Sequence, residues 1–102
     1  MYRYDSLALA LAQEAIAAKA DRKLTKNERM FMYLPFEHAE SRMIQKQSVK
    51  LLGQIWNKSD MKYAYDHKAV VDRFGRFPHR NKILGRKSTA AEKKFMLKHK
   101  GW

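Results

Sequence analysis

Cysteine is absent from the 102 residues of this chain. Its absence excludes disulfide scaffolds, zinc ribbons and thiol catalysis, and it is typical of a reducing compartment. Long apolar runs are missing too, since no stretch approaches the roughly 18–20 residues that a membrane-spanning helix needs. Asp5 and Glu14 interrupt the apolar opening that a signal peptide would require. We therefore expect a soluble, cytoplasmic protein with no membrane partner.

The sequence also lacks the local signatures of several enzyme classes. It has no glycine-rich phosphate-binding loop, no dinucleotide-binding fingerprint, and no serine or threonine in a nucleophile-elbow context. His38, His67 and His79, together with glutamates, offer general acid–base groups, but many non-enzymes carry as much. Catalysis stays open at this point, with a non-enzymatic role favoured and no cofactor expected.

Acidic residues are few, and the charge is uneven along the chain. The formal net charge is +12, and residues 61–102 hold 12 Lys and Arg against 3 Asp and Glu. Such a basic half attracts phosphates and nucleic acids through its summed field, although charge alone carries no specificity. Nucleic-acid binding by the C-terminal half is therefore one alternative for the function.

The rest of the composition is that of one folded domain, residues 1–102. With 45% apolar residues, a chain of this length can bury a hydrophobic core. Apolar residues recur at helical spacing, and no stretch alternates with the period of a strand. The sequence predicts an all-α fold of about five helices and no sheet, with helices over residues 2–20, after Thr25, over 39–57, over 60–74 and after Thr89.

Local signals mark several helix ends. Thr25 with Glu28, and Thr89 with Glu92, have the capping-box spacing, in which the two side chains bond each other's backbone amides. Gly75 is expected to stop the fourth helix. The second helix is predicted to have one apolar face, made of Met30, Phe31 and Leu34.

The segment RFGRFPHRN, residues 73–81, interrupts the helical pattern. Gly75 allows a positive φ, and Pro78 stiffens the exit from the turn. We expect Phe74 and Phe77 to pack into the core and to hold the neighbouring polar side chains in defined directions. Those side chains are Arg73, Arg76, His79, Arg80 and Asn81.

Three stretches in this order, YLPFEHAE (33–40), RFGRFPHRN (73–81) and LGRKSTAAE (84–92), resemble the signature segments of a mostly bacterial family, domain of unknown function 924. YDSLALALAQEAI (4–16) and QKQSVKLL (45–52) agree at weaker positions, so the resemblance covers nearly the whole chain. It implies a helical-hairpin array of the tetratricopeptide-like type and supplies no activity. Members usually carry a further N-terminal helical region, so this chain resembles the C-terminal part. We expect the apolar face left uncovered to favour oligomerisation.

Just after Pro35, near the expected end of the second helix, lie Glu37, His38 and Glu40, which we call the acidic corner. Two carboxylates and an imidazole within four residues offer metal ligands or an acid–base pair. Their spacing is not that of zinc proteases, and the cysteine ligands of zinc deaminases are missing. Asp66 and His67 join the corner only if their helix faces it. We therefore predict an inter-helix hydrogen-bond network here and no metal site.

Two interpretations of the RFGRFPHRN segment stay open. In the structural one, its arginines pair with acidic side chains and lock the fourth helix to the second; the expected partners are Glu37, Glu40, Asp66 or Asp72. In the functional one, the acidic corner and the basic segment line one cleft that binds a small anionic ligand. The candidate ligand-binding residues are Glu37, His38, Glu40, Arg76, His79, Arg80 and Asn81.

A weaker candidate anion site consists of Arg86, Lys87 and Thr89, because a helix N-terminus offers unpaired amides and a positive dipole end. Ser88 and Glu92 compete for those same amides, and the Glu92 carboxylate repels an anion. The leading hypothesis is a non-enzymatic interaction or scaffold module that binds a protein partner, or itself, through a helical groove. The alternatives are a small-molecule or phosphorylated-metabolite site, with hydrolysis as a variant of it, and nucleic-acid binding.

Overall fold

The computed structural model describes residues 5–99, and all the regular structure in this range is helical. The predicted all-α class with five helices is confirmed. The helices are α1 (Asp5–Ala17), α2 (Lys26–Glu37), α3 (Arg42–Leu52), α4 (Met61–Phe74) and α5 (Ala90–Lys98), with two 3-10 turns, η1 (Ala20–Lys23) and η2 (Pro78–Arg80). Within this range no helix is long and apolar enough to cross a membrane.

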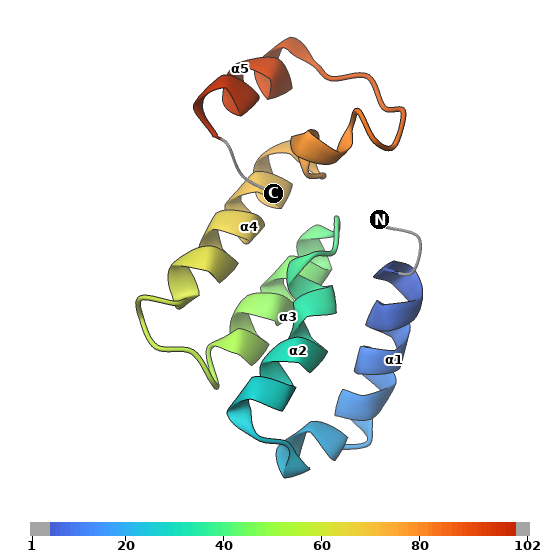
Figure 1. Ribbon diagram of the computed structural model, residues 1–102, viewed down its shortest axis with the longest axis vertical. Coiled ribbons are helices and arrows are strands. Elements are labelled where there is room, and N and C mark those ends of the chain that lie inside the picture. Colours follow the sequence, from blue (N-terminus) through green and yellow to red (C-terminus); the bar gives the residue numbers. More distant parts are fainter. Residues whose placement is uncertain (1–4, 100–102) are drawn as a thin grey trace.

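The helices follow one another as antiparallel neighbours. α1 packs against α2, α2 against α3, and α3 against α4. Figure 1 shows α1, α2 and α3 in one body, with α4 crossing beside α3 and α5 set apart beyond the C-terminal end of α4. The segment with η2 joins α4 to α5 and places α5 beyond the end of α4, in contact with η2 (Figure 1). The result is an elongated molecule of 45 × 29 × 20 Å.

Two hydrophobic clusters hold the helices together. The first lies between α2, α3 and α4 and is built from Tyr33, Leu52, Met61 and Ala64. The second joins the end of α4 to the following segment and α5; its buried members are Val70, Val71 and Phe77, with Phe74 and Phe95 packed against them. The expectation that both phenylalanines of the RFGRFPHRN segment pack inward is therefore confirmed.

The predicted apolar face of α2 was wrong in part. Phe31 is 67% exposed, whereas Tyr33 is fully buried and Phe36 nearly so. Tyr33 can be buried because its hydroxyl has partners: it donates to the buried Asp21 carboxylate and accepts from the Arg29 guanidinium. The buried face is thus set by a polar network that reaches back to η1.

Most of the predicted helix ends are found in the structure. Both capping boxes form, since the Thr25 and Thr89 hydroxyls accept from the amides three residues later and the glutamates reach back. Gly75 has φ +74°, a conformation that favours glycine, and it ends α4. The third helix is shorter than the predicted 39–57, because Ser41 caps its start and a turn follows Leu52.

The first helix also differs from its predicted range of 2–20. It ends at Ala17, and Lys19 has a positive φ of 60° that turns the chain into η1. Leu7 and Leu11 lie on the outer side of α1 and are 58% and 57% exposed. α1 therefore carries exposed leucines among the residues that the structure describes.

Candidate functional site

The C-terminal end of α2 is held in place by Gln45, a fully buried side chain on α3. Its amide donates to the carbonyl oxygens of Glu37 at 2.6 Å and Ala39 at 2.9 Å. Carbonyls at a helix end lack intrahelical partners, so a side chain from the next helix satisfies them here. This anchor fixes the backbone from which the acidic corner projects, with Pro35 in the last turn of α2.

Glu40 connects this corner to the segment after α4. Its two oxygens each accept a hydrogen bond of 2.9 Å from the Arg86 guanidinium, and one of them also accepts the Phe77 amide at 2.7 Å. Arg80 lies 4.0 Å away. Partial burial by itself would raise the pKa of Glu40, but the Arg86 and Phe77 hydrogen bonds outweigh it and lower that pKa.

Arg76 is engaged by Glu92 on α5. The guanidinium donates to both carboxylate oxygens, at 2.8 and 2.7 Å, and to the Lys87 carbonyl at 2.9 Å. Glu92 is only 2% exposed and also accepts the Thr89 amide of its own capping box. The Arg76 hydrogen bonds are the largest cause that lowers the pKa of Glu92 to about 2.

Asn81 and the weak anion site are likewise occupied by internal contacts. The Asn81 amide donates to the Ser88 hydroxyl, and its oxygen accepts from Arg86. Because Arg86 is paired with Glu40 and the amides at the start of α5 are capped by Thr89 and Glu92, the structure does not assemble an open anion seat there.

The structural interpretation of the segment holds for Glu40, one of its alternative partners, which lies 4.0 Å from Arg80. Asp66 and Asp72 instead pair with lysines one turn earlier on α4, at 3.7 and 2.5 Å. These i, i+4 pairs are local and need no tertiary contact. Glu92 was not anticipated as an arginine partner, although the short distance from Arg76 along the chain is a weak signal for it.

Glu37 faces a different set of groups, because α4 packs beside α2 and brings His67 to it. The Glu37 Oε1 lies 3.8 Å from the His38 Nε2 and 3.9 Å from the His67 Nε2. Burial raises the pKa of the Glu37 carboxyl to about 7 and lowers the pKa of His67 to about 4. The pKa of His38 is lowered by burial and by the positive charge of Arg80. Asp66, named with His67 as a conditional member, turns to Lys62 instead.

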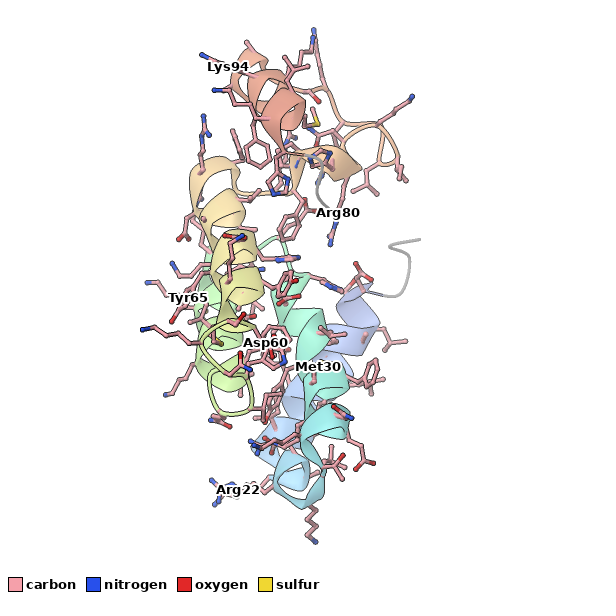
Figure 2. The ribbon with its side chains drawn as sticks, turned by 60° about the vertical axis from the view of Figure 1, so that its left-hand side comes forward. Arg22, Met30, Asp60, Tyr65, Arg80 and Lys94 are labelled. Carbon is pink, nitrogen blue, oxygen red and sulfur yellow. The ribbon has the colours of Figure 1, made fainter. Side chains whose placement is uncertain are left out.

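Arg80 and His79 point to different parts of the molecule. The Arg80 guanidinium stacks 4.6 Å above the Phe77 ring and lies 3.9 Å from the Asp5 carboxylate of α1. Figure 2 shows Arg80 between the α5 end of the molecule and the upper end of the three-helix body. His79 lies 6.2 Å from the Phe95 ring and 5.7 Å from the His99 ring, centroid to centroid, on the α5 side.

The candidate ligand-binding set therefore separates into groups. Glu40, Arg76 and Asn81 take part in hydrogen bonds that join the end of α2, the segment after α4 and the start of α5. Glu37 and His38 instead lie near His67 of α4. The sequence named His67 only as a conditional member, since nothing in a single sequence fixes which face of α4 meets α2. A cluster of one buried carboxylate and two imidazoles is the part of the site with ligand-binding chemistry of its own.

The described part of the chain also forms hollows outside this corner. A groove of about 420 Å³, which we call the interhelical groove, is formed by α1, α2 and α3 and the turn after α3; its lining residues are Gln13, Ile16, Ala17, Phe36, Gln47, Lys50, Leu51 and Gln54. A second hollow, the basic pocket, lies between α4 and α5 and is lined by Arg73, Lys94, Phe95, Lys98 and His99.

Comparison with known proteins places this chain among proteins without an assigned activity. The family described as bacterial protein of unknown function (DUF924) matches residues 1–100. The solved structure of ATU0120, a protein of unknown function from Agrobacterium tumefaciens, is similar, with a TM-score of 0.89 and 38% sequence identity. The match covers 97% of this chain and 56% of that one, so the chain spans just over half the length of ATU0120. No match was found among curated proteins.

Proposed function

This chain belongs to the DUF924 family, and we propose that it is a non-enzymatic interaction module, whose interhelical groove binds an acidic amphipathic helix of a protein partner. The proposal includes a tetratricopeptide-like arrangement of the helical hairpins and a cytoplasmic setting. The absence of cysteine is consistent with that setting.

The observation that carries the proposal is the make-up of the interhelical groove. Its apolar part comes from Ile16, Ala17, Phe36 and Leu51, and its polar part from glutamines and Lys50. An apolar strip with a polar rim is the surface that the apolar face of a helix occupies when it binds in a groove. Its lining residues come from α1, α2, α3 and the turn after α3, so a partner bound in it contacts several helices at once.

Charge indicates the polar side of that partner. The chain carries a formal net charge of +12, and the charged residue in the groove lining is Lys50. A partner helix that has glutamate or aspartate beside an apolar face of leucines associates faster in this positive field. It also binds more favourably at the rim of the groove. A lysine-rich helix of the same apolar pattern meets like charge instead.

We expect a synthetic helix of leucine and glutamate to perturb the backbone amide signals of Ile16, Ala17 and Leu51 in ¹⁵N-labelled chain, measured by NMR titration. Leu51→Lys should abolish the effect, because it places a charge in the apolar strip. Leu97→Lys is the matched control, since Leu97 lies on α5 and is 83% exposed.

Three results would contradict this proposal. The first is equal binding of a leucine–lysine helix, and the second is a set of perturbed signals outside the groove. The third is a concentration-dependent dimer, seen by analytical ultracentrifugation, that Leu51→Lys dissociates, because a second copy of the chain would then be the occupant.

A second candidate function, binding of single-stranded nucleic acid, is favoured by the basic pocket. Arg73, Lys94 and Lys98 line this pocket together with Phe95, whose ring stacks on His99 with centroids 4.9 Å apart and planes 17° apart. Figure 2 shows Lys94 at the outer end of the molecule, on α5. Sites for single-stranded nucleic acid combine positive side chains that contact the phosphates with aromatic rings on which the bases stack.

For this candidate we expect Lys94→Ala with Lys98→Ala to weaken binding of a single-stranded RNA oligonucleotide, measured by fluorescence anisotropy. The slope of log affinity against log salt should fall by about 1.4, because two phosphate contacts are lost at about 0.7 each. Lys46→Ala with Lys50→Ala, on α3, removes the same charge elsewhere and should leave the slope nearly unchanged. Equal slopes for the two double variants would show that only net charge acts.

A further inference from the structure

We propose that Glu37, His38 and His67 form a binding site for one Zn²⁺ ion between the C-terminal end of α2 and the middle of α4. The site is independent of the interhelical groove. It departs from the sequence-based prediction of no metal, which left open whether the helix that carries His67 faces the corner.

The first support is the geometry of the donor atoms. One ligand atom from each residue lies within 4.8 Å of the other two. A tetrahedral Zn²⁺ with bonds of about 2.0–2.2 Å holds its ligands roughly 3.4 Å apart. The 3.8 and 3.9 Å separations from the Glu37 oxygen to the two imidazole nitrogens are close to that value. The ligand atoms must move slightly closer together to bind the ion, and His38 can make this movement because its side chain is 46% exposed.

The second support is a buried carboxylate oxygen. Glu37 is 4% exposed, and its Oε2 accepts no hydrogen bond from any residue in the range 5–99. The imidazole nitrogens near Oε1 are too distant for hydrogen bonds. A buried carboxylate oxygen without a donor costs free energy unless it is paired or bound to a metal. A cation among these three side chains supplies the missing partner.

The third support is the orientation of the His67 ring. Its Nδ1 lies 2.7 Å from the Tyr63 carbonyl oxygen, which can only accept, so Nδ1 carries the proton. The Nε2 is then the nitrogen with the lone pair, and it is the one that faces Glu37. Metal-binding histidines commonly donate their other ring N–H to a carbonyl or carboxylate in this way. Gln45 meanwhile holds the Glu37 backbone carbonyl at 2.6 Å.

The charges around the cluster are compatible with a cation. Arg80 is the nearby positive group, and it acts on both histidines. Its charge is offset by Asp5 and Glu40, at 3.9 and 4.0 Å. Two nitrogens and one oxygen favour Zn²⁺ over Mg²⁺, which prefers oxygen ligands. Three protein ligands leave the fourth position for water or an anion, as in zinc sites that keep an open position.

The test is Zn²⁺ binding by the full, tag-free chain after chelator treatment, measured by isothermal titration calorimetry. We expect one Zn²⁺ per chain and a rise in Tm, with no such rise for Mg²⁺. His38→Ala should lower the affinity roughly 100-fold or more, because loss of even an outer partner of a ligand costs about 10–100-fold. His99→Ala is the matched control and should bind Zn²⁺ as the parent chain does, since His99 lies on the α5 side.

A spectroscopic readout separates coordination from folding. Co²⁺ in the site should show the intense visible bands of a four-coordinate ion, and His67→Ala and Glu37→Gln should lose them. Since both residues are buried, each variant is compared with the parent by circular dichroism in chelator. His38, being half-exposed, decides the matter if either variant unfolds. Absence of stoichiometric uptake, equal affinity in His38→Ala, or loss of uptake in His99→Ala would overturn the proposal.

Discussion

Replacing Glu40 with alanine is expected to lower the free energy of unfolding by about 3 kcal/mol, with a fall in Tm of roughly 10–20 °C for a chain of this size. Glu40 pairs with Arg86 through two hydrogen bonds and also accepts the Phe77 amide, with Arg80 4.0 Å away. The alanine leaves two guanidinium groups and a backbone amide without this acceptor at once, and half-buried donors are costly to leave unpaired. Urea unfolding followed by circular dichroism measures the loss.

A matched control distinguishes this network from ordinary surface charge. Asp66 pairs with Lys62 on the exposed side of α4, at 3.7 Å, and such a pair contributes at most about 0.5 kcal/mol. Asp66→Ala should therefore leave the midpoint nearly unchanged. Glu40→Gln, which keeps the shape and one acceptor oxygen, should fall between the two. If Glu40→Ala is as stable as Asp66→Ala, Glu40 does not hold the segment to α2.

The contact between Glu92 and Arg76 predicts a loss of stability in acid. The pKa of Glu92 in the folded protein is lowered to about 2 from the ordinary value of 4.5. Its contribution is therefore fully present above about pH 4.5 and is lost as the pH falls through about 2. The full displacement corresponds to about 3 kcal/mol, and solvent around Arg76, which is 27% exposed, reduces it to about 1–2 kcal/mol.

The measurement is the free energy of unfolding in urea at several pH values between 7 and 2. Glu92→Gln should be less stable than the parent chain at pH 7, and the difference should shrink toward zero as the pH approaches 2. Glu28→Gln is the control, because Glu28 occupies the same capping-box position on α2 without an arginine. A difference between parent and Glu92→Gln that is constant over this range would show that ionisation of Glu92 is not its source.

The fold class, the capping-box starts of α2 and α5 and the glycine end of α4 could be predicted from the sequence, because their causes lie within a few residues. Thr25, Thr89 and Gly75 act on amides and carbonyls of their own helix turn, so spacing along the chain is enough to identify them. The buried face of α2 could not be predicted in the same way. Phe31 and Tyr33 are both large and aromatic, and Tyr33 can be buried because Asp21 accepts a hydrogen bond from its hydroxyl.

The candidate site, too, could be predicted only in part from the sequence. The sequence identified Glu37, His38 and Glu40 as a corner with unusual chemistry, and Glu40 as an acceptor for an arginine. It did not determine that Arg76 would bind Glu92, nor that Glu37 would lie beside His67. The pairing of Arg76 with Glu92 joins residues 16 positions apart and depends on how α5 packs near the end of α4.

What the sequence by itself determined was the helical class, the capped starts of α2 and α5, the glycine stop after α4 and the basic charge of the C-terminal half. Each follows from composition or from interactions within one helical turn. Only the tertiary structure decided which side chains meet. α4 turns His67 toward Glu37, and Glu92 receives Arg76 although Glu28 in the same motif stays exposed. The reason is that helix packing sets distances between residues far apart in the sequence, and local propensity does not encode those distances.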